Sequence, residues 1–255
     1  MDKISTIDRR LEIINLVNSR GQVSVNNLSQ IFNVSEVTIR NDLSHLEKKG
    51  LIIKTRGGGL KIQSVGIDQQ LNEKAKINAK EKQAIGKKAA ELIKDNETII
   101  IDSGTTTVEI AKNIINLNNL TVITNALNIA SKLIRENVKL ILLGGFLRTT
   151  SLSLVGPIAE NSIRNFYCDK CFIGVDGIDS HLGIYTPIPE EAYLNRLMIE
   201  NSKEAIVVAD SSKFKKKSLS YIVPINKINT IITDSKIPKD ELKNLLNIGI
   251  KVILV

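Results

Sequence analysis

The chain has 255 residues, 42% of them apolar and 24% charged, and no apolar run approaches the roughly 18 residues that a membrane-spanning helix requires. Its start, MDKISTIDRRLEII, lacks the basic and apolar regions of a signal peptide, so we expect a cytoplasmic protein with no membrane partner. The net charge of +8 is uneven, because residues 1–63 and residues 64–255 each carry +4, and this N-terminal concentration favours a polyanionic partner.

Three helices are expected in the first 50 residues. The first covers 8–18 and ends before Gly21, and the second is short and begins after Ser24 as its N-cap. The third has the clearest start, because Val34, Ser35 and Ile39 match a capped helix with a hydrophobic staple. The apolar faces expected to point inward are Leu11, Ile14 and Val17, then Leu28, Ile31 and Phe32, then Ile39, Leu43 and Leu46.

Two short strands, 51–53 and 60–62, are expected after the helices, joined by a basic, glycine-rich turn over 54–59. Three helices followed by a hairpin make a winged helix. We therefore assign residues 1–62 to a winged helix-turn-helix DNA-binding domain, with the helix-turn-helix at about 23–43. The polar segment 63–79 is expected to be a linker, and residues 80–255 a separate α/β domain.

Beyond the linker, apolar strand-like runs alternate with helical patterns. The expected strands are 98–101, 120–124, 139–143, 171–175, 205–209, 230–233 and 250–255, and helices are expected over 190–200 and from Thr107, Leu127, Ile158 and Pro238. This alternation predicts an α/β fold with a mostly parallel sheet covered by helices on both faces.

The outer face of the third helix carries side chains that can read bases. Arginine pairs with guanine and asparagine with adenine, whereas basic wing residues suit phosphate or minor-groove contacts. The residues expected to contact double-stranded operator DNA are Ser35, Glu36, Thr38, Arg40, Asn41, Ser44, His45, Lys54 and Arg56. The structural alternative is that Arg40 and Glu36 form only an i,i+4 surface pair.

A candidate anion site lies where the strand ending at Asp102 gives way to Ser103, Gly104, Thr105, Thr106 and Thr107. The N–H groups and hydroxyls of such a helix start favour a phosphate, although a purely structural cap is an equal alternative. Open α/β sheets gather ligands at strand ends, and the candidates at the other strand ends are Asn125, Gly144, Gly145, Arg148, Asp176, Gly177, Glu190, Glu191, Asp210 and Lys213. Basic members of this set suit a phosphate and acidic members suit sugar hydroxyls or an amino group.

The only cysteines, Cys168 and Cys171, form a CxxC that is compatible with a redox pair or half of a zinc site. Tetrahedral zinc requires further ligands, and His45 and His181 stand in unrelated contexts. We therefore expect reduced thiols at a buried strand, no metal and no cofactor.

Several stretches together resemble one family. VSEVTIRNDL and the glycine-rich wing resemble the DNA-binding domain of the DeoR family of transcriptional regulators, and DSGTTTVEIA, VITNALNIA, LLGGFLR, FIGVDGID, EEAYLNRLMIE and VVADSSKF resemble its sensor half. The likeness is closest to a subgroup that represses N-acetylgalactosamine operons. It implies a homo-oligomeric repressor of a sugar or amino-sugar catabolic operon, whose sensor domain resembles sugar-phosphate isomerases in fold and binds a phosphorylated sugar of galactosamine or tagatose type.

The same likeness keeps an enzyme as the alternative: a sugar-phosphate isomerase or deaminase with an ancillary DNA-binding domain. Asp176 and Asp179 resemble the acidic signature of those isomerases, but the following SHLGIYTP does not reproduce their lysine-glycine loop. We expect a site that binds without turnover and has no catalytic residues. A DNA-architectural protein without an effector is a third, weaker possibility.

Overall fold

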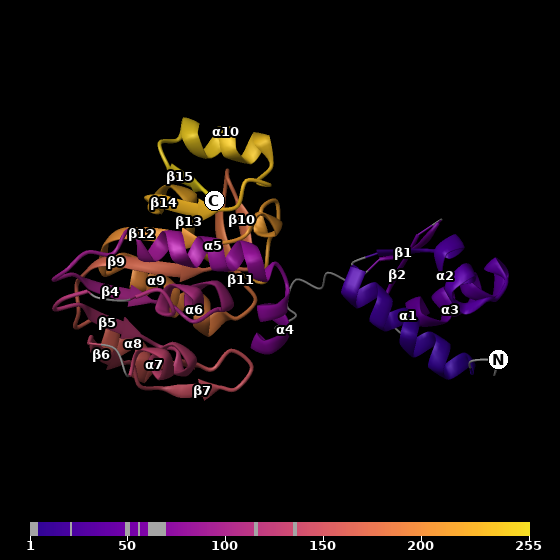
Figure 1. The fold of residues 1–255 in the computed structure, drawn as a ribbon, viewed down its shortest axis with the longest axis horizontal. Helices are drawn as coiled ribbons and strands as arrows, with labels where there is room; N and C mark the ends of the chain where they lie inside the picture. Colours follow the sequence, from indigo (N-terminus) through magenta and orange to yellow (C-terminus); the bar gives the residue numbers. More distant parts are fainter. Residues whose placement is uncertain are drawn as a thin grey trace. The chain divides into compact units, whose positions relative to one another are not determined.

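The computed structural model describes residues 5–20, 22–48, 52–55, 57–60, 70–114, 117–134 and 137–255. The chain divides into two compact units, Met1–Ser64 and Val65–Val255 (Figure 1). The boundaries expected from sequence, 1–62, 63–79 and 80–255, stay a prediction. Each unit is described separately below.

The N-terminal unit is a winged helix. Its elements are α1 (Thr6–Arg20), β1 (Gln22–Ser24), α2 (Val25–Phe32), α3 (Glu36–Lys48), β2 (Ile53–Thr55) and β3 (Gly58–Leu60). The strands form an antiparallel sheet in the order β1-β3-β2. Its core consists of Ile13, Val17, Val25, Leu28, Ile39, Leu43, Leu46 and Ile52. The helices confirm the helix-turn-helix expected from the apolar periodicity.

Three details of this unit differ from the sequence expectation. Leu11 and Ile31, expected to point inward, are 56% and 47% exposed, and Ile13 and Val25 take the core positions instead. Among the described residues the hairpin continues into the expected turn, because Lys54 pairs with Gly59 and Thr55 with Gly58. Residues 51, 61 and 62 of the expected strands lie outside the described residues. The third strand, β1, was not expected, because a run of only three residues is too short to show a strand pattern.

A buried ion pair joins the first helix to the third. The carboxylate of Asp42, whose side chain is 2% exposed, accepts hydrogen bonds from Nε of Arg9 and Nε of Arg10, each at 2.7 Å. Two of the arginines that make the N-terminal segment basic are therefore used inside the unit, and Arg9 itself is buried. The positive charge available to a partner comes from the remaining basic residues.

A seven-stranded parallel sheet forms the centre of the second unit. Its strands are β4 (Thr98–Ile101), β5 (Thr121–Thr124), β6 (Lys139–Leu142), β9 (Cys168–Gly174), β12 (Ser202–Val208), β14 (Thr230–Thr233) and β15 (Lys251–Leu254), and they lie in the order β15-β14-β12-β9-β4-β5-β6. All six neighbouring pairs are parallel. This confirms the expected α/β class, and β9 begins three residues earlier than predicted.

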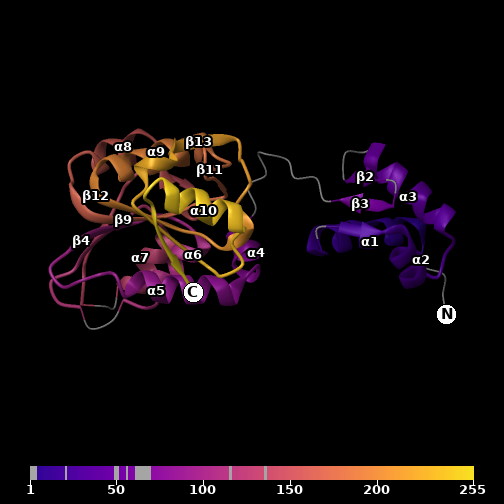
Figure 2. The ribbon, with the colours of Figure 1, turned by 90° about the horizontal axis from the view of Figure 1, so that it is seen from above.

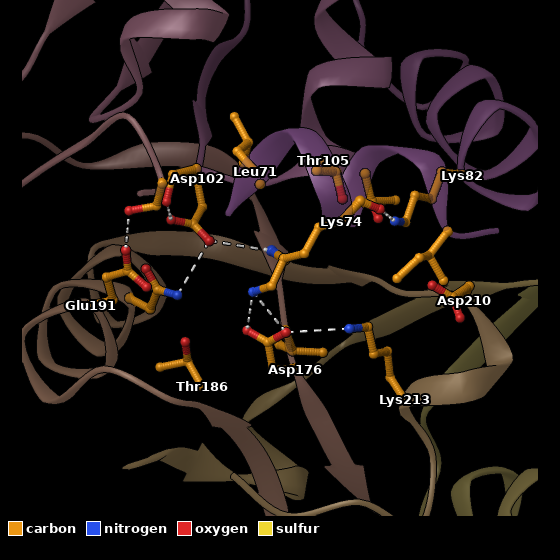
Figure 3. A pocket seen from close by; sticks show the side chains of 18 of the residues that line it. Leu71, Lys74, Lys82, Asp102, Thr105, Asp176, Thr186, Glu191, Asp210 and Lys213 are labelled. Carbon is orange, nitrogen blue, oxygen red and sulfur yellow. Dashed lines mark hydrogen bonds and ion pairs between the residues drawn. The ribbon is translucent and has the colours of Figure 1, made fainter. Parts of the chain in front are cut away.

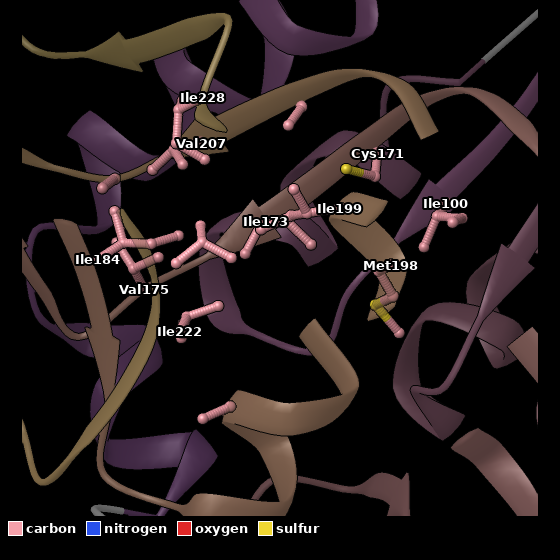
Figure 4. Close-up of a cluster of buried hydrophobic side chains, with 14 of the residues drawn as sticks. Ile100, Cys171, Ile173, Val175, Ile184, Met198, Ile199, Val207, Ile222 and Ile228 are labelled. Atoms are coloured by element: carbon pink, nitrogen blue, oxygen red, sulfur yellow. The ribbon is translucent and has the colours of Figure 1, made fainter. Parts of the chain in front are cut away.

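Helices cover both faces of this sheet (Figure 2). One face packs against α5 (Ala79–Ala90), α6 (Thr105–Ala111) and α7 (Leu127–Leu133), the other against α8 (Pro157–Ile163), α9 (Pro189–Glu200) and α10 (Lys239–Asn247). Alternate strand residues serve alternate faces: Ile99 and Ile101 point to the first and Ile100 to the second. Figure 4 shows Ile100, Cys171 and Ile173 on the second face, in one cluster with Met198 and Ile199 of α9.

Short strands and one short helix complete the second unit. Two antiparallel groups of strands were not expected. One is a hairpin of β7 (Phe146–Arg148) and β8 (Ser153–Val155), and the other is a sheet of β10 (Gly177–Asp179), β11 (Gly183–Thr186) and β13 (Ser220–Pro224). A short helix, α4 (Leu71–Lys76), lies within the segment expected to be a linker. Among the described residues, no helix is long and apolar enough to cross a membrane.

Candidate functional site

The candidate site lies where the order of the parallel strands reverses. From β4 the chain proceeds outward to β5 and β6, then returns to place β9 on the opposite side of β4. Loops that leave the carboxyl ends of β4 and β9 therefore diverge, and such a switch point opens a crevice in α/β sheets. A cavity of about 800 Å³, open mouth included, occupies this position.

The cavity brings together residues from six parts of the sensor unit. It is lined by Leu71, Lys74, Ile77, Lys82, Asp102, Ser103, Gly104, Thr105, Thr106, Ser151, Gly174, Val175, Asp176, Thr186, Glu191, Asn195, Asp210, Ser212 and Lys213. Nine of the sixteen residues expected from sequence are among them: Asp102, Ser103, Gly104, Thr105, Thr106, Asp176, Glu191, Asp210 and Lys213. Their role in binding stays a prediction.

A basic cluster forms one side of the cavity (Figure 3). Nζ of Lys74, from α4, lies 3.0 Å from Oδ1 of Asp176, and Nζ of Lys213 approaches the same oxygen at 3.2 Å. Burial opposes ionisation of Asp176, but the two ammonium groups outweigh it and hold the pKa of this carboxyl below its ordinary value. The resulting triad carries a net positive charge toward the cavity.

A third lysine stands behind this triad. Lys82 of α5 is 5% exposed, and its ammonium donates to the backbone carbonyl of Lys74. Burial lowers the pKa of Lys82 to about 8, although the charge of Asp210 partly counteracts it. Asp210 is itself buried and accepts hydrogen bonds from Nδ2 of Asn78, at 2.8 Å, and from the N–H of Ser212.

The opposite side of the cavity is rich in hydrogen-bond acceptors. Asp102 follows β4 and is 2% exposed, and its Oδ2 accepts from the N–H of Gly174 at 3.3 Å and from Nδ2 of Asn195 at 3.2 Å. Burial, together with the nearby charge of Glu191, raises the pKa of Asp102 well above its ordinary value. Asp102 therefore retains a proton in conditions where an exposed aspartate has lost it.

Glu191 is held in place by Ser151, Ser153 and Arg148 on its own side of the cavity. Its Oε1 accepts hydrogen bonds from the hydroxyls of Ser151 and Ser153 at 2.7 and 2.9 Å, and Nε of Arg148 lies 3.3 Å away. Arg148 is thus paired with a carboxylate and does not line the cavity, contrary to the expectation that it cradles a phosphate.

Part of the helix start at 103–107 lines the cavity. Ser103 donates its N–H to Oδ1 of Asn125 at 3.2 Å, and the hydroxyl of Thr107 donates to the carbonyl of Gly104 at 3.1 Å. These two bonds fix the turn. The first turn of a helix leaves N–H groups without intrahelical partners, and at α6 that turn lines the cavity through Thr105 and Thr106.

Seven of the expected residues lie outside the cavity, for identifiable reasons. Thr107 and Asn125 are fully buried as supports of the loop, Glu190 is exposed, and Arg148 is paired with Glu191. The glycines Gly144, Gly145 and Gly177 also lie outside the cavity lining. A Cβ atom on Gly145 would lie 2.5 Å from the carbonyl oxygen of Val155, and a Cβ atom on Gly177 would lie 2.5 Å from the carbonyl oxygen of Lys216. These two glycines allow close backbone approach rather than ligand contact.

Ten lining residues were not expected from sequence, and four of these come from the segment before the first strand of the sheet. Leu71 and Lys74 lie on α4, Ile77 is the residue that caps α4, and Lys82 lies on α5, so none of the four follows a strand of the sheet. Asn195 was missed although its neighbour Glu191 was named. Their spacing of four residues on a helix was the available signal, since it places both side chains on one face.

The outer face of α3 presents the residues expected to read DNA. Glu36, Arg40 and Asn41 are exposed, and Thr38, Ser44 and His45 are partly exposed. Ser35 caps the helix, because its Oγ accepts from the N–H of Thr38 at 3.2 Å. The hydroxyl of Ser44 accepts from Nζ of Lys54 at 2.6 Å, which joins the wing to the helix. Arg56 lies outside the described residues.

The structural alternative for Arg40 is present in the molecule. Its guanidinium lies 2.7 Å from Oε2 of Glu36, with both side chains about half exposed. An exposed pair of this kind contributes only about 0.3–0.5 kcal/mol. The pair therefore leaves Arg40 able to exchange its partner for a base at little cost.

The cysteines and the acidic residues form no metal centre within the described ranges. Cys168 and Cys171 are free thiols buried on β9, and burial raises their pKa values to about 11 and 12. Asp179 accepts the N–H groups of His181 and Leu182 at 3.0 and 3.1 Å, so it stabilises a turn and does not line the cavity.

Comparisons with known proteins agree with this architecture. Residues 9–65 match the DeoR-like helix-turn-helix domain, and residues 77–235 match the DeoR C terminal sensor domain. A putative aga operon transcriptional repressor of Escherichia coli O157:H7 is 42% identical over 98% of this chain and 94% of that protein. The glycerol-3-phosphate regulon repressor of Escherichia coli K12 is 34% identical over 89% and 90%.

Among solved structures, a ribose 5-phosphate isomerase A of Methanocaldococcus jannaschii matches 54% of this chain and 55% of its own, with 18% identity and a TM-score of 0.41. The sequence matches are far more extensive. They cover both units, and they include the α3 surface and most of the cavity. The chain belongs to the DeoR family of transcriptional regulators.

Proposed function

We propose that this chain represses a sugar or amino-sugar catabolic operon and that a phosphorylated sugar, bound in the sensor cavity, controls its binding to operator DNA. The observation that carries the ligand class is the convergence of Lys74, Lys82 and Lys213 with the start of α6 on one cavity. Two carboxylates, Asp176 and Asp210, offset only part of this charge. A dianionic phosphate suits such a site because helix N–H groups and ammonium groups both favour anions.

The opposite side of the cavity suits the sugar itself. Asp102, Glu191, Asn195 and Thr186 are buried polar groups that line it. Hydroxyl groups both donate and accept hydrogen bonds, so a sugar can match a mixed set of acceptors and donors of this kind. The division into a basic side and an acceptor-rich side supports a ligand with one anionic and one polyhydroxylated end.

The DNA-binding role rests on α3 and the wing. Exposed Arg40 and Asn41 and partly exposed Thr38 support contacts to base edges, and Lys54, which donates to Ser44 of α3, supports a contact to phosphate. The relatives' names, which include an aga operon repressor and a glycerol-3-phosphate regulon repressor, support repression as the sign of regulation. We propose a homo-oligomer that works in the cytoplasm and binds double-stranded DNA.

Helix α4 provides a route from the cavity to the DNA-binding unit. It is the first described element after residues 61–69, which connect it to the winged helix along the chain. It has no buried residue, and polar contacts hold it: Lys74 with Asp176, and the N–H of Leu71 with the carbonyl of Thr150 at 3.0 Å. Since Leu71 and Lys74 line the cavity, a ligand there changes the contacts that hold α4.

The experiment that tests the proposal is a gel shift with DNA upstream of the protein's own gene and its neighbours. Binding is measured with and without a panel of hexose phosphates and amino-sugar phosphates, including galactosamine 6-phosphate and tagatose 6-phosphate, and each sugar is assayed for conversion. A specific shift that one unconverted sugar phosphate reverses is the expected result. Turnover of a sugar without a specific shift would instead identify an enzyme.

A further inference from the structure

Asn195 occupies an unusual position at the acceptor-rich side of the cavity. It lies on α9, one turn after Glu191, and it is 3% exposed although it lines the cavity. Its Nδ2 donates to Oδ2 of Asp102 at 3.2 Å. Its Oδ1 is buried, and within the described part of the chain no donor pairs with it. A buried carbonyl oxygen without a donor is costly, and native proteins rarely leave one unsatisfied.

The hydrogen bonds around Asp102 fix the orientation of this amide. Oδ2 of Asp102 also accepts the N–H of Gly174 at 3.3 Å, so this oxygen acts as an acceptor. The group that Asn195 turns toward it must therefore be the NH₂, and the carbonyl oxygen is left on the other side. The hydroxyl of Ser103 donates to the remaining oxygen, Oδ1 of Asp102, at 3.4 Å, so both oxygens of this carboxyl act as acceptors.

The surroundings indicate what kind of donor fits. Glu191, the nearest charged neighbour on the same helix face, already pairs with Arg148 and with the hydroxyls of Ser151 and Ser153. Among the described residues, Arg148 thus offsets the charge of Glu191, and the amide of Asn195 is itself neutral. A neutral donor, such as a hydroxyl or an amide N–H, matches this oxygen better than a cation does.

We propose that Oδ1 of Asn195 accepts a hydrogen bond from one hydroxyl or amide N–H on the sugar end of the ligand, and that Asn195 thereby selects among sugar phosphates. This inference rests on the proposed function, since it takes the ligand of the cavity to be a phosphorylated sugar. It goes further by naming the residue that distinguishes one such sugar from another. Sites that hydrogen-bond a hydroxyl discriminate strongly against an analogue that lacks it, because the protein group is left unpaired.

The test measures, for the full-length chain, the dissociation constants of the best-binding hexose phosphate and of its monodeoxy analogues by calorimetry. In the wild type, one analogue is expected to bind about tenfold or more weakly than the parent sugar. For Asn195→Ala, the dissociation constants of the parent and of that analogue are expected to lie within about twofold of each other, because the variant lacks the oxygen that accepts the discriminating hydrogen bond. The other analogues keep their ratios to the parent.

Two further variants keep the test decisive. Asn195→Leu has nearly the same volume without polar atoms, and it serves where the alanine variant melts at a much lower temperature. Asn201→Ala, at the end of the same helix and outside the cavity, is the matched control and should keep every ratio of the wild type. The inference is overturned if the Asn195 variants still discriminate against the same analogue. If the wild type binds operator DNA but no sugar phosphate, the ligand class itself is wrong.

Discussion

Substitution of Arg40 distinguishes a role in reading DNA bases from a role in a surface ion pair alone. We expect Arg40→Ala to weaken operator binding by about 1–3 kcal/mol, because a guanidinium that reads a base makes two hydrogen bonds that alanine cannot replace. Binding of the sugar phosphate should not change. Quantitative gel shifts on operator DNA and on a scrambled duplex measure the loss and show whether it is specific.

Glu36→Gln tests whether the pair with Glu36 accounts for the role of Arg40. It removes the charge of the partner that lies 2.7 Å from Arg40 and leaves the guanidinium in place. If the pair only stabilises α3, both variants will lose a few tenths of a kcal/mol of stability and neither will lose operator binding.

Thr105→Trp should show the opposite pattern to Arg40→Ala, with the ligand site blocked and operator binding retained.

We expect Lys82 to make ligand binding depend on pH. Burial lowers its pKa to about 8 in the free protein, and a bound phosphate favours the ammonium form and so raises that pKa. Affinity is therefore complete below pH 8 and falls as the pH rises through the pKa of the free protein. We expect binding at pH 9 to be roughly tenfold weaker than at pH 7, with protons taken up on binding near pH 8.

Calorimetry in buffers of different ionisation enthalpy measures this proton uptake directly. The phosphate group itself has its second pKa near 6, so its own titration lies below the window from pH 7 to 9. Lys82→Met should bind weakly and show little pH dependence there. A wild-type affinity that stays constant from pH 7 to 9 would mean that Lys82 does not interact with the ligand.

At the scale of elements, α4 is the part of the sensor unit whose contacts the ligand is expected to change. Cysteines introduced as Asn72→Cys and Thr149→Cys would face a common surface hollow, so a short bis-maleimide can join α4 to the loop over 149–152. The native thiols of Cys168 and Cys171 are buried with raised pKa values and should not compete. We expect the joined protein to bind the sugar phosphate but to lose its effect on operator affinity.

The unjoined double variant provides the comparison. It should show the full effect of the ligand on operator affinity, which for allosteric proteins is about 5–150-fold. Operator affinity is measured with and without ligand before and after the reaction, and wild-type protein treated with the reagent controls for other modification. A joined protein that responds as strongly as the unjoined one would exclude α4 as the route.

The elements differ in how far the sequence could predict them. The strands of the large sheet were predictable because buried parallel strands form continuous apolar runs, as Ile99–Ile101 does. The strands β7 and β8 are three residues each, and Phe146 on β7 is 71% exposed, so no pattern marked them. Helix α4 buries nothing, and without an apolar face it had no periodicity to detect.

The same distinction applies to the candidate site. Residues at strand ends, such as Asp102 and Asp176, were predictable because the topology of parallel sheets brings those ends together. Lys74 and Lys82 were not, since they reach the cavity from helices that precede the first strand of the sheet. Their positions follow from tertiary contacts with Asp176 and with the carbonyl of Lys74, and no local pattern encodes such contacts.

At the scale of the whole molecule, each chain supplies a single recognition helix. One helix-turn-helix contacts only a few base pairs, and helix-turn-helix proteins gain affinity and specificity by binding two half-sites as dimers. The proposed homo-oligomer therefore predicts an operator with two related half-sites, palindromic or repeated, whose centres lie about one helical turn or a multiple of it apart. The symmetry of the protein would be reflected in the DNA.

Sedimentation velocity and footprinting test this prediction together. We expect the full-length protein to sediment at a multiple of the chain mass at concentrations where it protects the operator. A duplex with one half-site should bind at least about a hundredfold more weakly than the complete operator, because the second contact becomes intramolecular only when both half-sites are present. A monomer that binds one half-site as tightly as the full operator would contradict the oligomer, and regulation would then have to act within a single chain.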